Sequence, residues 1–276
     1  MTALVLDRMY RMPTVFGPMP GPRNLPHERQ HLRFERETFA IAVTARTDPA
    51  SLAQLLPARC ELDGEARLEI GIYHLTKVGW LAGRGYNIAM VRIPAVFAGE
   101  RETVRGSFIP VLWESLCEPI LTGREELGWP KLPAEISDAT LDDGSWRAGA
   151  SWQGFRFLDI EASGFVESAA PEASAPMFVH KYIPRCGEWG HADASYIAVS
   201  GAERPATVRE LKRGSGRFGF HPARWEDMPT QYPHRQRTRC TALGIRRRDS
   251  NEDFGRRGSE QPENRVLMAR SGAYPC

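Results

Sequence analysis

The chain has 276 residues, 42% of them hydrophobic and 25% charged, which is enough to bury a substantial core in one large domain. It contains no run of about 18 apolar residues and no N-terminal basic region followed by an apolar segment. The sequence therefore predicts neither a membrane span nor a signal peptide, and we expect a cytoplasmic protein. The net charge of +2 is unevenly distributed. Ten arginines and five acidic residues fall in residues 233–276, leaving 26 basic and 29 acidic residues, a net charge of −3, in the first 232.

The N-terminal third reads as an arm followed by strands. Five prolines in residues 1–32 predict an extended arm. Alternation over residues 34–43 predicts a strand, and Asp48 followed by Pro49 predicts the start of a short helix. Residues 67–74 alternate as a strand, which places Glu69 on the face opposite Leu68 and Ile70. Alternation alone cannot say whether that opposite face meets solvent or a lumen.

The middle of the chain alternates glycine-containing turns with apolar strands. Residues 83–87 predict a tight turn before a strand at 88–97, and the polar run 99–106 predicts a loop before a strand at 108–113. Pro119 can begin a helix that Gly128 ends. We also expect a meander over 134–167 and short strands at 177–182 and 195–199. The sum is α+β, mainly β, which favours a curved or closed antiparallel sheet over βαβ units.

Cysteine and histidine spacing predicts no cofactor. The five cysteines form no CxxC pair, so buried free thiols are expected rather than a disulfide framework. The seven histidines form no HExxH motif or other clustered ligand spacing, so no metal is predicted.

Lys131 is the residue most suggestive of chemistry. It is one of only four lysines and lies among Trp129, Leu132 and two prolines. An arginine cannot lose its proton, whereas a lysine in apolar surroundings can become a neutral amine that condenses with a ketone to form a Schiff base. The alternative is a surface lysine after a helix stop, because unusual environments also occur for structural reasons.

The run Pro119–Lys131, PILTGREELGWPK, resembles the signature of the acetoacetate decarboxylase family. The resemblance extends more loosely over residues 13–231. It implies a cone-like closed antiparallel β-barrel, a homo-oligomer, and a Schiff-base lysine at Lys131. Acetoacetate decarboxylase is itself a standard example of an activated lysine.

The resemblance also implies partners for Lys131. Arg36 falls on the family's active-site arginine and Glu69 on one of its two glutamates. The second lysine of the family falls on Leu132, so this chain lacks a like charge there. Without the resemblance, Arg36 and Glu69 would be read as a surface ion pair or solvated strand charges.

Four residues are predicted to bind substrate. The family's second glutamate falls in the turn at 83–87, where Arg84, Tyr86 and Asn87 offer hydrogen bonds in place of a carboxylate. The aromatic residue Trp129 lies two positions before Lys131. The predicted substrate-binding residues are Arg84, Tyr86, Asn87 and Trp129.

The resulting prediction is a Schiff-base-forming carbon–carbon lyase acting on a small keto acid. One alternative is an aldolase-dehydratase that joins pyruvate to an aldehyde, since both reactions pass through an imine or enamine. Another is a noncatalytic barrel that binds a small apolar ligand, with Lys131 lining its wall.

We predict a division between an acetoacetate decarboxylase-like domain, residues 1–232, and a basic tail, residues 233–276. The tail shows no helical or strand period and no RNA-binding signature, so neither nucleic acid nor membrane is expected as a partner. A one-base shift of a permissible back-translation restores an apolar helix-like segment from residue 233. The tail is therefore either disordered or the product of a frameshift.

Overall fold

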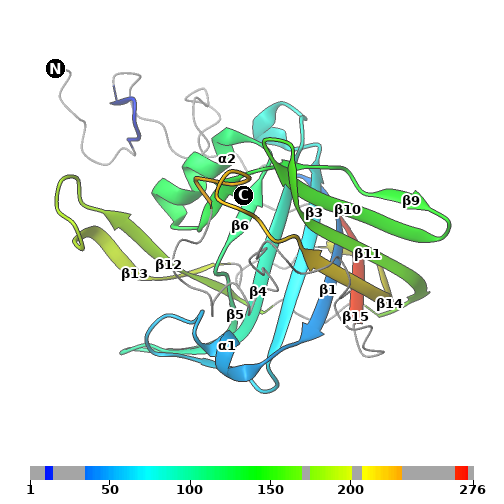
Figure 1. Ribbon diagram of the computed structural model, residues 1–276, viewed down its shortest axis with the longest axis horizontal. Coiled ribbons are helices and arrows are strands. Elements are labelled where there is room, and N and C mark those ends of the chain that lie inside the picture. The colour runs from blue at the N-terminus through cyan, green and yellow to red at the C-terminus, as the bar shows by residue number, and fades with distance from the viewer. Residues whose placement is uncertain (1–9, 15–34, 170–174, 201–206, 232–264, 273–276) are drawn as a thin grey trace.

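The computed structural model describes residues 10–14, 35–169, 175–200, 207–231 and 265–272, the last as backbone only. Most of these residues lie in strands and the helices are short, as the sequence predicts (Figure 1). The helices are α1 (Pro49–Ala53), η3 (Gly79–Leu81), α2 (Cys117–Thr122) and η4 (Gly123–Leu127). The strands are β1 (Glu37–Arg46), β2 (Cys60–Leu62), β3 (Arg67–Thr76), β4 (Tyr86–Ala98), β5 (Thr103–Phe108), β6 (Leu112–Glu114), β7 (Lys131–Pro133), β8 (Glu135–Ile136), β9 (Thr140–Asp142), β10 (Ser145–Trp152), β11 (Phe155–Glu167), β12 (Met177–Pro184), β13 (Ala192–Ser200), β14 (Thr207–Phe220) and β15 (Arg265–Gly272).

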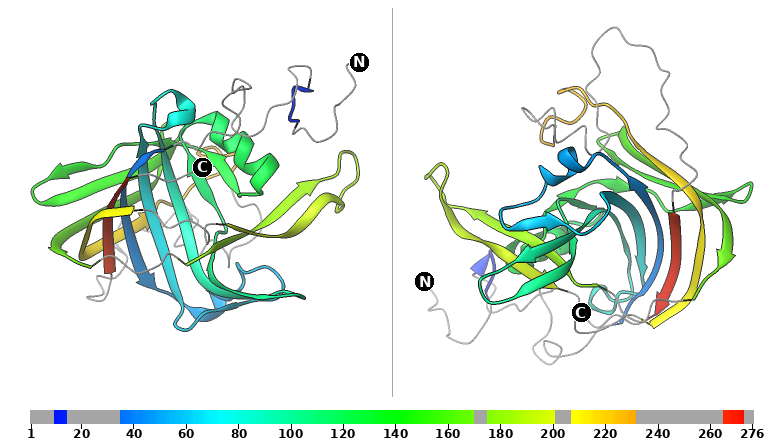
Figure 2. Two further views of the ribbon diagram at one scale, coloured as in Figure 1. Left: turned by 180° about the vertical axis from the view of Figure 1, so that it is seen from behind. Right: turned by 90° about the horizontal axis from the view of Figure 1, so that it is seen from below.

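The strands form one mainly antiparallel sheet in the order β13-β12-β5-β4-β3-β1-β15-β14-β11-β10-β8. The pairs β5–β12 and β6–β7 are parallel. The sheet curls into an incomplete ring, and the β12–β13 hairpin extends away from it (Figures 1 and 2). Among the described residues no ladder joins β13 to β8, so the closed cone-like barrel is not confirmed. Ala134 joins β7 to β8 in the chain.

The larger hydrophobic core takes side chains from strands all around the ring. In β3 it includes Leu68, Ile70 and Ile72, which are almost fully buried and follow the period of two that the sequence predicts. Strands far apart in the sheet order, such as β3 and β10, can share a core only on the concave side. We call this cluster the inner core.

A smaller cluster lies on the opposite face of β4 and β6. Its buried members are Met90, Ile109, Leu112 and Val179, and Trp129 packs against it. Val179 belongs to β12, so that strand covers this face of the sheet. We call this cluster the outer layer.

The helix start at Asp48 and the helix stop at Gly128 are confirmed, whereas the second helix begins at Cys117, two residues before the predicted Pro119. Asp48 caps α1 by accepting a hydrogen bond from the Ser51 backbone N–H at 2.7 Å, and Leu52 is fully buried. The predicted helix ending at Gly128 is α2 followed directly by η4, a single π-helical turn. Gly128 ends it with a left-handed φ of 78°, a conformation that glycine adopts without steric cost.

Two details of the predicted strands are wrong. The polar run 99–106 is a strand from Thr103 onward, because Val104 and Gly106 alternate inward and pair with β4. The predicted strand 108–113 is split, with Phe108 ending β5 and Leu112 beginning β6. Pro110 lies between them and cannot donate a ladder hydrogen bond.

The predicted tail is described only in part. Residues 265–272 form β15, which pairs with both β1 and β14, so the expectation of a tail without regular structure is wrong for this stretch. The remainder of 233–276, like most of the predicted arm 1–32, lies outside the described residues. The domain division at residue 232 and the frameshift hypothesis stay predictions.

The described cysteines are free but not all buried. Cys117 and Cys186 are exposed, which corrects the expectation of buried thiols, whereas burial raises the pKa of the half-buried Cys60 thiol to about 11. In the described part of the chain, no helix is long and apolar enough to span a membrane. No group of three potential metal ligands gathers among the same residues. The predictions of no metal and of a cytoplasmic location stay predictions.

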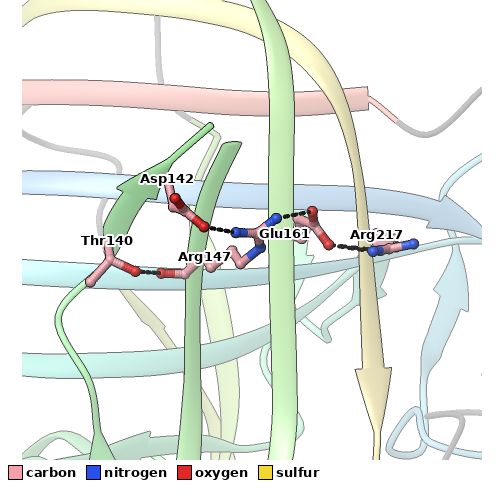
Figure 3. Close-up of polar contacts among 5 residues, drawn as sticks. All are labelled: Thr140, Asp142, Arg147, Glu161 and Arg217. Atoms are coloured by element: carbon pink, nitrogen blue, oxygen red, sulfur yellow. Dashed lines mark hydrogen bonds and ion pairs between the residues drawn. The ribbon is translucent and has the colours of Figure 1, made fainter. Parts of the chain in front are cut away.

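A row of alternating charges crosses the sheet from β10 to β14 (Figure 3). Arg147, Glu161 and Arg217 are aligned in register on three neighbouring strands. Glu161 accepts from Arg217 Nε at 2.9 Å and from Arg147 Nη2 at 3.2 Å, while Arg147 also reaches Asp142 at 2.6 Å. The hydrogen bonds from Arg217, with the charges of both arginines, lower the pKa of Glu161.

We predict that Glu161→Gln lowers the free energy of unfolding by about 0.5–1 kcal/mol at pH 7, the usual range for partly exposed pairs. Because the folded-state pKa is lowered, the stabilisation is present above the ordinary pKa of 4.5 and is lost as the pH falls through the folded value. Urea unfolding at pH 7 and near pH 3 measures this. The exposed Glu61 on β2 provides the control variant Glu61→Gln. A difference between Glu161→Gln and the wild type that stays constant with pH would contradict the prediction.

Candidate active site

The end of the α2–η4 helix sets the position of Lys131. The backbone N–H groups of Gly128 and Trp129 both donate to the Gly123 carbonyl, the second at 2.9 Å. The chain then turns, and the Lys131 N–H donates to the Trp129 carbonyl at 2.8 Å where β7 begins. Arg124 Nη1 donates to the Lys131 carbonyl at 2.9 Å. Backbone hydrogen bonds therefore fix Lys131 relative to the helix.

The amine of Lys131 is directed into the protein. Its side chain is only 12% exposed, and Nζ lies 2.8 Å from Glu114 Oε1 and donates to the Pro119 carbonyl at 3.0 Å. Its aliphatic end rests on Gly123, where an added Cβ would overlap Cδ, Cε and Nζ. Gly123 thus leaves the space that the lysine side chain occupies.

Glu114 is the acidic partner of Lys131. It ends β6 and is 1% exposed. Burial raises the pKa of Glu114 above 4.5, because removing water disfavours the carboxylate, and the positive charges of Lys131 and Arg36 oppose this effect. A carboxyl group that exchanges its proton in a higher pH range than usual, next to an amine, can act as a general acid or base.

Arg36 lies in the same electrostatic environment. It precedes β1, is half-buried, and its charge acts on Glu114. The structure therefore brings together Lys131 and Arg36, two of the three predicted catalytic residues.

Glu69 does not contact Lys131. Its carboxylate lies 3.3 Å from Arg92, the residue directly opposite it on β4. Glu114 pairs with Ile88, which pairs with Tyr73 on β3. Glu69 is four residues along β3 from that level, about 13 Å at the usual strand rise. The carboxylate beside the lysine is therefore Glu114 and not Glu69.

Trp129 and Tyr86 lie on the Lys131 side of the sheet. Trp129 is half-buried against the outer layer. Tyr86 is 9% exposed and packs in a neighbouring apolar cluster beside Trp80, with ring centroids 6.4 Å apart. Both side chains can contribute apolar walls near the lysine.

Asn87 and Arg84 face elsewhere. Asn87 alternates to the opposite face of β4, and its amide donates to the Ile136 carbonyl at 2.9 Å and to Asp138 at 2.8 Å. Arg84 is exposed and its guanidinium donates within its own turn, to Leu81. Asn87 is directed away from Lys131 because one strand position reverses a side chain's face. Arg84 lies before β4 begins, and its side chain is held in its own turn by the bond to Leu81.

Leu132 points away from Lys131. It packs against the inner core, whereas Lys131 lies level with Leu112 of the outer layer. A lysine at position 132 of this chain would therefore lie on the other face of β7. Besides that of Lys131, the positive charge that acts on Glu114 is the charge of Arg36.

Sequence reasoning missed Glu114. The residue stands at the end of an apolar stretch, and a single acid there reads as the solvated end of a strand. The available signal was its position between the apolar residues Trp113 and Leu116, next to a predicted helix. Only the parallel pairing of β6 with β7 brings it to Lys131.

The protein also has an open depression of about 450 Å³. It is lined by Ser115, Ala134, Glu135, Ile136, Ser137, Ser151 and Arg156. Ser115 follows Glu114 and has the opposite strand parity, so this depression belongs to the other face of β6. None of the predicted site residues lines it.

The family of the chain follows from its sequence. The model of the family described as acetoacetate decarboxylase (ADC) matches residues 11–238, so the chain belongs to the acetoacetate decarboxylase family. Among curated proteins, no sequence matches it.

Several solved structures share the fold of this chain. An acetoacetate decarboxylase superposes with a TM-score of 0.64 at 16% identity, covering 96% of each chain. The enduracididine biosynthesis enzyme MppR, complexed with the condensation product of pyruvate and imidazole 4-carboxaldehyde, gives 0.61 at 14% identity, covering 94% of this chain and 95% of its own. Acetoacetate decarboxylase from Legionella pneumophila gives 0.60 at 17% identity, covering 100% and 97%.

We predict that Gly123→Ala keeps the fold but displaces Lys131. Gly123 has ordinary helical angles, φ −62° and ψ −40°, so alanine fits the backbone and favours the helix by up to about 1 kcal/mol. The three atoms nearest to the added methyl group all belong to the flexible end of Lys131. We expect a free energy of unfolding within about 1 kcal/mol of wild type and at least about tenfold slower modification of Lys131 by a keto acid and borohydride.

The matched control is Gly219→Ala on β14, where an added Cβ meets no atom within 4 Å. Urea unfolding and mass spectrometry of the trapped adduct measure the two effects separately. An unchanged rate of adduct formation in Gly123→Ala would show that the reactivity of Lys131 does not depend on the space left by Gly123.

Proposed function

We propose that this protein is a Schiff-base-forming lyase that acts on a small keto acid through Lys131. The observation that carries the proposal is the contact between Lys131 Nζ and Glu114 Oε1, 2.8 Å apart and both largely removed from water. A buried amine beside a carboxyl group of raised pKa has a proton acceptor at the atom that must become nucleophilic.

The first step is formation of an imine. Glu114 takes a proton from the Lys131 ammonium, and the neutral nitrogen attacks the substrate carbonyl carbon to form a C–N bond. The carbonyl oxygen takes one proton from that nitrogen and one back from Glu114, and leaves as water, giving a protonated imine. In this proposal Arg36 supplies positive charge for the substrate carboxylate or for ionised Glu114.

The protonated imine then serves as an electron sink. In a β-keto acid, the bond to the carboxylate breaks, its electrons move toward the nitrogen, and carbon dioxide leaves. The resulting enamine is protonated on carbon, and water hydrolyses the imine to release the product and the amine. The lysine is thereby returned to its starting state.

A second candidate is the aldolase-dehydratase reaction. An enamine from pyruvate would attack an aldehyde, form a carbon–carbon bond, and then lose water. The fold shared with MppR, whose structure contains a condensation product of pyruvate and an aldehyde, favours testing this reaction. The two chemistries are separated by following carbon dioxide from acetoacetate and unsaturated keto acid from pyruvate plus an aldehyde.

The proposal includes a homo-oligomeric, cytoplasmic protein whose partner is a small keto acid. Trp129 and Tyr86 are proposed to contact the substrate, whereas the roles assigned to Arg84 and Asn87 depend on a rearrangement of their present hydrogen bonds. Glu69 is still proposed as a catalytic residue, but one that pairs with Arg92 and does not touch Lys131.

We predict that Lys131→Arg folds but forms no adduct with pyruvate or acetoacetate. The guanidinium keeps the positive charge needed beside Glu114 but cannot provide a neutral amine. The measurement is the mass of the protein after incubation with keto acid and borohydride, with peptide mapping of the modified residue.

Lys77→Arg is the matched control, because Lys77 is an exposed lysine paired with Glu37 at 3.0 Å. Wild type and control should carry one reduced adduct at Lys131. An adduct that persists in Lys131→Arg would contradict the assignment. A folded wild type without any adduct would instead support the small-ligand-binding alternative.

We predict that Glu114→Gln slows adduct formation by about 10²-fold or more, the usual contribution of a positioned acid or base. In the wild type, the trapping rate should rise with pH through an inflection above 4.5, because burial raises the pKa of Glu114 and only its ionised form accepts the proton. The variant should lose this inflection. Glu69→Gln is the comparison, and an equal loss in both variants would contradict a special role for Glu114.

A further inference from the structure

Lys181 is a second buried lysine that the proposed mechanism does not use. It lies on β12, is 9% exposed, and its ammonium donates to the Glu126 carbonyl at 2.9 Å. The ring of Tyr196 lies 5.7 Å from Nζ. Across the described ranges, no carboxylate forms an ion pair with it. Because burying an ammonium is costly, the carbonyl and the aromatic ring are the groups that compensate its charge.

The contacts of Lys181 are with the end of the helix that precedes Lys131. The Glu126 carbonyl is among the last of the helix, which have no partner within it, and a cation there interacts favourably with the helix dipole. The stem of Lys181 packs on Gly128, where an added Cβ would overlap its Cβ, Cγ and Cδ. One side chain therefore holds both the carbonyl and the left-handed glycine.

Gly128 is connected by hydrogen bonds to Gly123, the residue on which the Lys131 side chain packs. The N–H groups of Gly128 and Trp129 both donate to the Gly123 carbonyl. The Lys131 side chain rests on Gly123 at the other end of the same turn. A displacement of Gly128 is thus transmitted through two backbone hydrogen bonds to the surface that orients the reactive amine.

The strand that carries Lys181 is itself firmly docked. Val179, two residues earlier on the same face of β12, is 2% exposed in the outer layer, against which Trp129 also packs. On the N-terminal side, Arg11 forms an ion pair with the Glu126 side chain at 2.9 Å. Residues distant in the sequence, Arg11 and Lys181, therefore stabilise the end of this helix.

We propose that Lys181 is a positioning residue for Lys131, acting through the turn Gly123–Gly128. This proposal rests on the Schiff-base function of Lys131 and extends it. Loss of the Lys181 ammonium releases the Glu126 carbonyl, loosens the Gly128 turn, and moves Lys131 Nζ out of reach of Glu114. Lys181 itself forms no bond with the substrate.

The test compares Lys181→Met with Tyr196→Leu. Methionine keeps an apolar stem on Gly128 but removes the donor, whereas Tyr196→Leu removes the aromatic ring and leaves the bond to Glu126. We expect Lys181→Met to slow borohydride trapping of pyruvate at Lys131 by about tenfold and to shift its pH profile, and Tyr196→Leu to stay within about twofold of wild type. Urea unfolding of both variants measures their general loss of stability.

Hydrogen exchange of the Gly128 and Trp129 amides provides a readout that does not depend on activity. These amides should exchange faster than in the wild type in Lys181→Met, and at the wild-type rate in Tyr196→Leu. The proposal would be overturned if Lys181→Met formed the adduct, or exchanged these amides, at the wild-type rate. It would also be overturned if adduct formation slowed equally in both variants. If the wild type forms no adduct, the Schiff-base function fails, while amide exchange still supports or overturns the hold of Lys181 on the turn.

Discussion

The buried contact between the Lys131 amine and the Glu114 carboxyl group constrains the structure around it. Removing both charges from water costs several kcal/mol per ion, and deleting one partner leaves the other uncompensated. Lys131 comes from β7 and Glu114 from β6, so the pair can form only if the parallel register of these strands is kept. The Pro119 carbonyl accepts a second contact from Lys131 Nζ, which ties the pair to α2.

The helix that joins β6 to β7 is held by cations from three parts of the chain. Arg11 contacts Thr122 and Glu126, Lys131 contacts Pro119, and Lys181 contacts Glu126. Its last turn is π-helical, a geometry often found at functional sites. The wide turn, with glycine at both ends, leaves room for two lysine stems against the backbone. The same features that stabilise the helix thereby orient the amine.

The fold is shared with known structures at low sequence identity. Identities of 14–17% accompany nearly complete coverage, so the framework persists although most side chains differ. The reaction is decided by a few residues grafted on that framework. In this chain the side chain after Lys131 is Leu132, which belongs to the inner core, and the nearby positive charge comes from Arg36.

The sequence by itself determined the local features. It identified the cap at Asp48, the alternation of β3, the helix stop at Gly128 and the unusual lysine at 131, because each depends on neighbouring residues and backbone preference. Only the tertiary structure selected Glu114 over Glu69 and brought Lys181 to the helix end. These choices depend on strand register and on which face a side chain occupies, and a shift of one residue reverses that face without changing any local pattern.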